Sequence, residues 1–534
     1  MKNLIIKKQV ERLSLTIKSH QFTLIIFLFF ILGLLLYKNA ITATFIWDDI
    51  ALITKNSTIT TPQNLPKLFT EDIGSFIGLP YTFYRPVHMV TNMFDYLFWG
   101  YNAKGYHLTN ILLHIVVSFS LFIVIFKLSK QFLLSFIVSI FFLVHPVHTE
   151  AVAYISGRAD LLVGLFTLLM LILYYSYLEK DTHKNWYLFY SLIFFFLALL
   201  SKESALIYPF LLLLIHYVLK KRVQIISFLP YCILAILYLV IRYIIYDSLL
   251  PAPLSVNTCI QNIPGFFVAF STYFGLLLSP HNLHMEYGMK VFRFFHTQTL
   301  FGFGIFILVL ICLVICRKKY RLLFFALTWF LLTLLPVSNI YPLNAFMAEH
   351  WLYFPSIGFF LCVGIGIAKL LQINRIRTPV ILVACIVLIW YSHLTIKQTQ
   401  YWSNPLTFYT RTISFAPTSY RSYFNLAVAH QEKGHIKQAI EAYKKAITLN
   451  NTYEFASINL AALFFEQGKK KEAFDLYHKV LKINPLNTLA HNNLALMYYH
   501  LGEKEQAMKH AQKAFLLGGD TIHEEVKKIY EELS

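Results

Sequence analysis

The stretches NLAVAHQEKGHIKQA (425–439), NLAALFFEQGKKKEA (459–473) and NLALMYYHLGEKEQA (493–507) determine how the end of this 534-residue chain folds. Each begins Asn-Leu-Ala and ends on alanine, and the glycines Gly434, Gly468 and Gly502 lie 34 residues apart. Small and large apolar residues at fixed positions with this period predict helix–turn–helix units that stack into a solenoid.

A period of 34 residues is typical of tetratricopeptide repeats. Pro417 falls where a repeat ends, and three repeats are then expected at 417–450, 451–484 and 485–518. The polar segment 521–533 is expected to cap them, within a repeat domain of residues 417–534. Residues 397–416 resemble a half-repeat that connects this domain to residues 1–396.

Residues 1–396 have the composition of a membrane protein. The whole chain is 57% hydrophobic and only 14% charged, whereas soluble domains average about 25% charged residues. The apolar residues gather in runs long enough to span a bilayer. These runs are 21–38, 107–126, 131–144, 161–178, 186–201, 205–219, 225–245, 264–279, 299–316, 322–340, 354–371 and 378–396.

The charge distribution predicts the topology. If 264–279 is re-entrant or interfacial and the N-terminus is cytoplasmic, the basic clusters at 1–18, 220–222 and 317–321 all face the cytoplasm. Excess Lys and Arg on the cytoplasmic side is the usual arrangement. We therefore expect an all-α fold with about 11 membrane crossings. The repeats then lie outside, in a periplasm or lumen, and a bacterial inner membrane is favoured over the endoplasmic reticulum.

Charge and cysteine content exclude other classes. The formal net charge is +19, but its distribution follows membrane topology, so no nucleic-acid partner is expected. The six cysteines lie mostly in apolar runs, and none forms a CxxC motif. Neither a disulfide framework nor a cysteine zinc site is predicted.

Carboxylates concentrate on the predicted external face. Asp48 and Asp49 directly follow the first apolar run, behind Trp47. One interpretation is a general base that takes a proton from a hydroxyl, with its neighbour binding a metal or positioning substrate. The alternative is a solvated loop start beside an interfacial tryptophan.

Three cations accompany these acids on the same face. Arg85, Arg158 and Lys202 could hold an anionic lipid headgroup beside a carboxylate base. Each could instead form a routine ion pair or reach toward the membrane surface. Nearby carboxylates complete the candidate carrier-phosphate or sugar site, namely Glu150, Asp160, Glu203 and Glu349.

His145 and His148 lie close to Glu150 in HPVHTE, which resembles a metal-ligand set. The spacing differs from that of a helical HExxH site, and Pro146 interrupts it. We expect a polar network at a helix end, with a divalent metal as the alternative. His107, Asn110 and His114 share one helix face and are expected to form interhelical hydrogen bonds.

Several motifs occur in one order along the chain: FIWDDIALITKN (45–56), YRPVHMVTNMFDYLFWGYNAKGYHLTNILLH (84–114), HPVHTEAVAYISGRADLL (145–162), SKESAL (201–206) and AEHWLYFPSIGF (348–359). With the repeats, this set resembles the transmembrane and tetratricopeptide-repeat O-mannosyltransferase family and its bacterial relatives. That family belongs to the GT-C glycosyltransferases.

The resemblance implies an enzyme that moves mannose or another hexose from a polyprenyl-phosphate carrier to a protein Ser or Thr hydroxyl outside the membrane. It implies that residues 1–396 form a GT-C-like transferase domain and that the repeats bind the acceptor. Asp48 and Asp49 match the acidic pair at the catalytic position. His350 departs from the pattern, since an arginine is expected there.

Two other classes of protein remain open. A membrane-anchored scaffold or assembly factor would use the repeats to recruit a partner, but would not require many spans or acids gathered on one face. A transporter is disfavoured because the spans show no internal duplication and no obvious charge at mid-bilayer.

Overall fold

The computed structural model describes residues 21–71, 83–180, 182–246, 256–288, 290–341, 343, 345–518 and 523–533. The basic head at 1–20 and parts of two predicted external loops lie outside these ranges. The chain divides into two compact units, Met1–Asn404 and Pro405–Ser534. Within the described ranges every regular element is helical, as the sequence predicts. The functional division at residues 396 and 416 stays a prediction.

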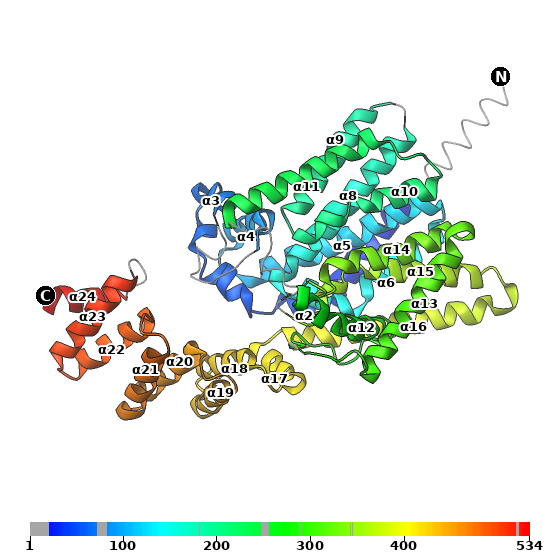
Figure 1. The fold of residues 1–534 in the computed structure, drawn as a ribbon. Coiled ribbons are helices and arrows are strands. Elements are labelled where there is room, and N and C mark those ends of the chain that lie inside the picture. The colour runs from blue at the N-terminus through cyan, green and yellow to red at the C-terminus, as the bar shows by residue number, and fades with distance from the viewer. Residues whose placement is uncertain are drawn as a thin grey trace, which may run out of the picture. The chain divides into compact units, whose positions relative to one another are not determined.

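The first unit is a bundle of helices (Figure 1). Its longer helices are Gln21–Leu36, α4 (Pro86–Trp99), α5 (Ala103–Ser129), α6 (Phe132–Val144), α8 (Arg158–Glu179), α9 (Lys184–Leu199), α10 (Phe210–Leu219), α11 (Ile225–Tyr246), α12 (Val256–Leu278), α13 (Thr297–Lys319), α14 (Arg321–Leu334), α15 (Ser356–Leu370) and α16 (Arg377–Trp402). The short α-helices are α2 (Lys38–Ile41), α3 (Lys67–Thr70) and α7 (Thr149–Ala153).

Short 3₁₀-helices and a π-helix lie between these elements. They are the π-helix η1 (Ile50–Thr54) and the 3₁₀-helices η2 (Ser57–Thr60), η3 (Pro62–Asn64), η5 (Pro146–His148), η6 (Ile155–Gly157), η7 (Glu203–Ile207), η8 (Leu335–Val337), η9 (His350–Leu352) and η10 (Asn374–Ile376). Most of the candidate site residues lie on or beside these short turns, where the backbone leaves a regular helix.

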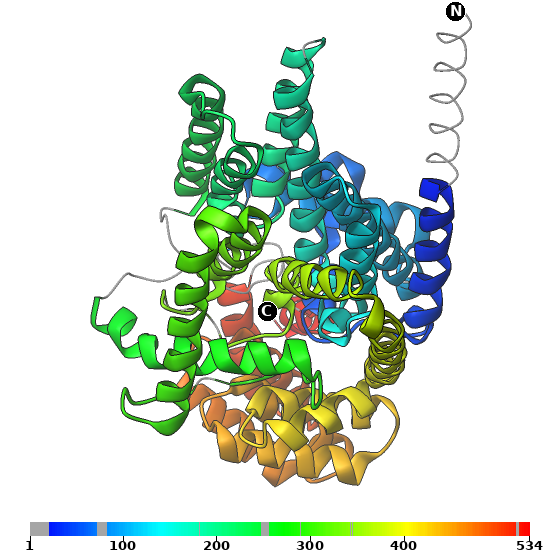
Figure 2. The same ribbon diagram turned by 90° about the vertical axis from the view of Figure 1, so that its right-hand side faces the viewer.

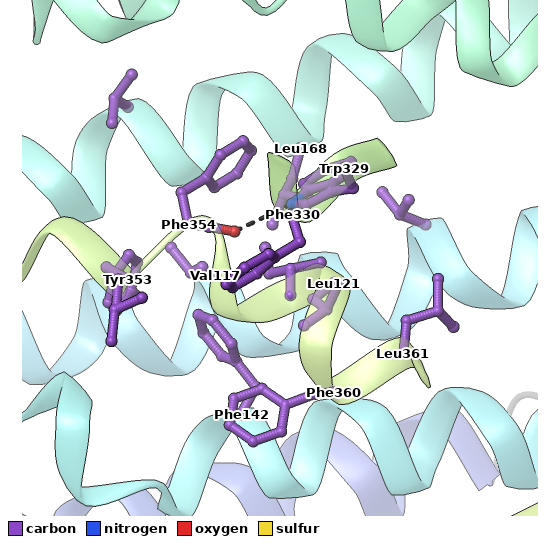
Figure 3. Packing of buried hydrophobic residues seen from close by; sticks show 14 of the residues in the cluster. Val117, Leu121, Phe142, Leu168, Trp329, Phe330, Tyr353, Phe354, Phe360 and Leu361 are labelled. Atoms are coloured by element: carbon purple, nitrogen blue, oxygen red, sulfur yellow. Dashed lines mark hydrogen bonds between the residues drawn. The ribbon is translucent and has the colours of Figure 1, made fainter. Parts of the chain in front are cut away.

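Aromatic and aliphatic side chains from α5, α6, α8, α14 and α15 form the centre of this bundle (Figure 3). The Trp329 indole N–H donates to the Phe354 carbonyl at 3.0 Å, which satisfies the buried ring nitrogen. The first helix packs along one edge (dark blue in Figure 2), where the rings of Phe22 and Phe122 meet edge to face at 5.4 Å. A second, smaller cluster around Leu52, Ile53, Met89 and Ile155 packs beside the aspartates.

Each of the twelve predicted apolar runs falls on an apolar helix. In the described part, six helices are long and apolar enough to cross a membrane, or seven if the bent pair Phe132–Val144 and Pro146–Ala153 is one span. Five shorter apolar helices accompany them. These features identify a multi-pass membrane protein, while eleven crossings stay a prediction. Cys259–Leu278 has the length of a span, so the re-entrant reading of 264–279 also stays a prediction.

The second unit is a stack of antiparallel helix pairs (Figure 1). Its helices are α17 (Pro405–Phe415), α18 (Tyr420–Glu432), α19 (Ile436–Leu449), α20 (Glu454–Glu466), α21 (Lys470–Ile483), α22 (Thr488–His500), α23 (Lys504–Gly518) and α24 (Glu524–Leu533). Gly434, Gly468 and Gly502 have φ of +75°, +76° and +78°. Each sits in the turn inside a pair, where left-handed backbone favours glycine.

Alanines at the repeat positions let neighbouring helices approach closely. Ala461 on α20 is fully buried, and the equivalent Ala427 and Ala495 are buried too. We expect Ala461→Arg to destabilise the repeats by about 3–5 kcal/mol, since it introduces an unpaired buried charge. Thermal unfolding of a 405–534 fragment followed by circular dichroism measures this. The neighbouring Ala462 is only half-buried, so Ala462→Arg is the control, and equal melting of both variants would contradict the assignment.

Candidate active site

Asp48 and Asp49 are helical residues that directly precede η1, just after a turn at Trp47. Trp47, just before them, adopts a left-handed φ of +53°, which is unusual for a bulky residue. Asp49 is fully buried, whereas Asp48 is half-buried. The Asp48 amide donates to the Tyr154 hydroxyl at 3.2 Å. The two adjacent carboxylates therefore have different environments, and Asp48 has the more accessible side chain.

The Asp49 carboxylate accepts three hydrogen bonds. Its Oδ1 accepts from the Ser156 amide at 2.9 Å and the Ser156 hydroxyl at 2.6 Å, and its Oδ2 accepts from the Ile46 amide at 3.3 Å. Burial raises the pKa of Asp49, the bonds from Ser156 and Ile46 lower it, and the Asp48 charge raises it, with a result of about 7. Asp49 therefore changes charge near neutral pH.

Every second residue of segment 154–160 contacts a charged residue of the candidate site or its surroundings. Tyr154 contacts Asp48 and Ser156 contacts Asp49, as described above. Arg158 pairs with Asp95 at 2.5 Å, and Asp160 pairs with Lys202 at 2.6 Å. A Cβ on Gly157 would lie 2.8 Å from the Ala151 carbonyl oxygen, so this tight turn requires glycine.

Arg158 is completely buried and belongs to an interior polar network. Besides Asp95, it donates from Nε to Asn110 Oδ1 at 2.7 Å and from Nη2 to the Tyr106 carbonyl at 3.1 Å. Asp95 also accepts from the Thr109 hydroxyl at 2.8 Å. Sequence analysis did not identify Asp95. A usable signal was the spacing of polar residues along α4, where His88, Asn92 and Asp95 share one buried face.

Arg85 and Glu203 form a bidentate pair. Arg85 donates from Nε to Oε2 at 3.0 Å and from Nη2 to Oε1 at 2.6 Å. Burial raises the pKa of Glu203, but the charge and hydrogen bonds of Arg85 and the charge of Lys202 outweigh it and lower the pKa to about 2. Both side chains keep some exposure, 18% for Arg85 and 29% for Glu203. The pair thus lies at the edge of the bundle interior.

The three predicted cations converge around His88 on α4. Burial lowers the pKa of His88 well below its usual value, and the charges of Arg158, Arg85 and Lys202 lower it further. All three charges thus act on His88, and each cation is also paired with a carboxylate. Arg85 is the most exposed of the three.

Glu150 and Glu349 contact residues other than the three cations. Glu150 is buried and accepts from the His350 amide at 2.9 Å and pairs with His350 Nδ1 at 2.7 Å. Glu349 accepts from the His284 amide at 2.5 Å and the Tyr287 hydroxyl at 2.8 Å. His350, which departs from the family pattern, is therefore the partner of a candidate site carboxylate.

His145 and His148 make protein contacts at every ring nitrogen. His145 accepts from the Val147 amide at 3.2 Å and its Nε2 lies 3.1 Å from the Leu277 carbonyl. His148 bonds the Phe142 carbonyl at 2.8 Å and the Ser356 hydroxyl at 3.0 Å. Among the described residues, no group of three or more His, Cys, Asp and Glu side chains is arranged to hold a metal. These contacts match the polar network expected at this helix end.

The predicted hydrogen bonds of α5 are present in part. Asn110 donates to the carbonyls of Val152 and Tyr154, at 3.3 and 3.1 Å. His114 bonds the Tyr353 hydroxyl at 2.8 Å and the Leu143 carbonyl at 3.1 Å. His107 is equally buried. α5 thus ties the 143–155 segment to the core, and Tyr154 of that segment in turn contacts Asp48.

The repeat unit carries a groove of about 440 Å³ between its first and second repeats. Its floor is apolar, and two acids and a lysine flank it. The lining residues are Lys444, Ile447, Thr448, Leu460, Phe464, Glu472, Asp475 and Leu476. This shape and composition are compatible with an extended polypeptide segment.

Comparison with known proteins supports the family resemblance. Models of the tetratricopeptide repeat match residues 420–453, 458–484 and 490–517. The chain is 29% identical over 444 residues to Protein O-mannosyl-transferase F38B6.6 of Caenorhabditis elegans, which covers 79% of this chain and 62% of that protein. It is 24% identical over 461 residues to Protein O-mannosyl-transferase TMTC3 of Homo sapiens, which covers 77% of this chain and 50% of that protein.

The chain thus spans about half to three fifths of the length of these curated relatives. Among solved structures, MamA from Desulfovibrio magneticus is 17% identical, with a TM-score of 0.21, and covers 24% of this chain and 81% of that chain. The relatives that match over three quarters of this chain are protein O-mannosyl-transferases. The resemblance inferred from the sequence motifs is confirmed.

Proposed function

We propose that this membrane protein is a glycosyltransferase that moves mannose, or another hexose, from a polyprenyl-phosphate carrier to a Ser or Thr hydroxyl of a protein. The observation that carries the proposal is the half-buried Asp48, which adjoins the buried Asp49 and the 154–160 segment. Segment 154–160 in turn joins these acids to the paired cations. The transfer takes place on the external face of the membrane.

The chemistry is a single displacement with inversion. Asp48 accepts the proton of the acceptor hydroxyl, whose oxygen forms a bond to the anomeric carbon. The bond from that carbon to the phosphate oxygen breaks, and polyprenyl phosphate leaves with the electron pair. Asp49 acts on Asp48 rather than on substrate, because its oxygens already accept from Ser156 and Ile46.

The leaving phosphate requires positive charge. Arg85 is our first candidate, because its pairing with Glu203 uses Nε and Nη2 and leaves Nη1 for a phosphate oxygen. Lys202 is the second candidate. Arg158 is completely buried and its Nη2 pairs with Asp95, so we assign it a role in holding α4, α5 and α8 rather than in binding the carrier.

The repeats provide the acceptor-binding surface in this proposal. The apolar groove flanked by Glu472 and Asp475 is suited to an extended acceptor segment with a basic side chain. The alternative function, a non-enzymatic scaffold, uses the same surface but requires no transfer. The two differ in whether sugar becomes covalently attached to the bound protein.

A transfer assay tests the proposal. Membranes that contain the full-length protein are supplied with labelled polyprenyl-phosphate mannose and a Ser/Thr-containing acceptor protein. We expect label on acceptor hydroxyls, with an anomeric configuration opposite to that of the donor, and none with membranes lacking the protein. If the acceptor protein binds but carries no label with any of several polyprenyl-phosphate hexose donors, the scaffold function would be favoured.

A further inference from the structure

Ser156 makes the closest contacts to the acidic pair. Its amide and its hydroxyl both donate to Asp49 Oδ1, at 2.9 and 2.6 Å, although the two residues lie 107 positions apart in sequence. Ser156 precedes the first turn of α8, so Asp49 also lies near the positive end of a 22-residue helix.

We propose that Ser156 is a positioning residue of the transfer reaction, which holds Asp49 ionised and in place so that Asp48 can act as the base. This inference rests on the proposed function and names a residue that the family motifs do not single out. Ser156 acts through Asp49 and does not itself touch the substrate.

The geometry supports a positioning role rather than general packing. An ionised carboxylate is an acceptor only, and Asp49 accepts from three donors, two of which belong to Ser156. Gly157 locks the next position, because any side chain there would meet the Ala151 carbonyl. The closely packed backbone therefore holds the Ser156 hydroxyl within hydrogen-bonding distance of Asp49.

Electrostatics give the direction of the effect. The bonds from Ser156 lower the pKa of Asp49, while burial raises it. Removing the hydroxyl therefore raises that pKa, and more Asp49 is protonated at neutral pH. The negative charge of Asp48 also raises the pKa of Asp49. Other titratable or charged side chains on η6, on the elements packed against it, or paired with them include Asp95, Tyr106, His107, Glu150, Tyr154, Arg158 and Asp160.

The charge on Asp49 matters for the neighbouring base. A negative charge beside Asp48 favours proton transfer to it, because like charges close together favour the protonated form. When Asp49 takes up a proton, this assistance is lost. Activity should therefore fall as pH drops through the pKa of Asp49, which lies near 7.

The test compares Ser156→Ala and Ser156→Thr with the parent, using full-length protein and the transfer assay at several pH values. We expect Ser156→Ala to lower kcat about tenfold at pH 7, as loss of one charge-assisted hydrogen bond would. KM for the donor should stay nearly constant, and the acid limb of the pH profile should move to higher pH. Ser156→Thr keeps the hydroxyl and should retain most of the activity.

Ser118→Ala is the matched control, since Ser118 is fully buried and donates only to its own helix, at the His114 carbonyl. It should leave kcat and the acid limb unchanged. If Ser156→Ala does not fold, Ser156→Cys replaces it, because a thiol has a similar size but is a weaker donor. Its kcat and acid limb are then compared with those of Ser156→Thr.

Three outcomes separate failure of the inference from failure of the proposed function. If Asp48→Asn abolishes transfer but Ser156→Ala or Ser156→Cys keeps the parent kcat and acid limb, Ser156 has no positioning role. A lower kcat with an unmoved acid limb would likewise overturn it, as a merely structural effect. If Asp48→Asn and Asp49→Asn both transfer sugar at the parent rate, the proposed base itself is wrong.

Discussion

Asp48→Asn is expected to lower sugar transfer by about 10²–10⁴-fold, the usual contribution of a general base. Asparagine has nearly the same shape but cannot accept the acceptor proton. Asparagine keeps the backbone amide that donates to the Tyr154 hydroxyl at 3.2 Å, so this bond survives the substitution. Transfer from labelled polyprenyl-phosphate mannose by membranes with equal amounts of each variant measures the effect.

Glu71→Gln is the matched control for Asp48→Asn. Glu71 is an exposed acid in the same predicted external segment, so its neutralisation should leave transfer within about twofold of the parent. Asp49→Asn should also reduce transfer, because an amide offers only one oxygen where Asp49 accepts with both. Parent activity in Asp48→Asn would assign proton removal to another group and would strengthen the scaffold alternative.

Arg158→Met is expected to destabilise the first unit by about 3–5 kcal/mol, the cost of removing one partner of a buried ion pair. Methionine fills similar space without charge, but it leaves Asp95 buried and without its cation. The same change removes the bonds to Asn110 and the Tyr106 carbonyl. Thermal inactivation and unfolding of the detergent-solubilised protein measure the loss.

Arg375→Met is the control for the loss of stability. Arg375 is exposed, so this substitution should leave the free energy of unfolding nearly unchanged. Adding Asp95→Asn to Arg158→Met should recover part of the stability, because the unpaired charge is removed while Thr109 keeps an acceptor. If the double variant were no more stable than Arg158→Met, the buried charge would not be the cause of the loss.

The sequence predicted the repeats with little ambiguity. Glycines spaced by 34 residues occupy left-handed turns, and the alanines at equivalent positions are buried. These features follow from local backbone geometry and from the period of a helix pair, and both can be read from the sequence alone. The apolar runs likewise fall on helices, because a stretch of apolar residues in a bilayer must satisfy its backbone internally.

The candidate site was predictable only as a set of residue types. Asp48, Arg85 and Lys202 stand out in sequence as charged residues beside apolar runs. Their partners do not, and Asp95 and Ser156 look like ordinary polar residues of a helix and a loop. The expectation that Arg158 holds an anionic headgroup looked reasonable in sequence, but Arg158 has no exposed surface.

The order of the residues thus determines the helices, the repeat period, the membrane character and the supply of acids and bases. Which acid meets which base is a property of the tertiary structure. Arg158 and Asp95 are 63 positions apart, Asp49 and Ser156 are 107 apart, Arg85 and Glu203 are 118 apart, and His350 and Glu150 are 200 apart. Such pairs form only when the packing of distant helices brings them within a few ångström and excludes water, because electrostatic attraction is strong only at short range in a poorly polarisable interior.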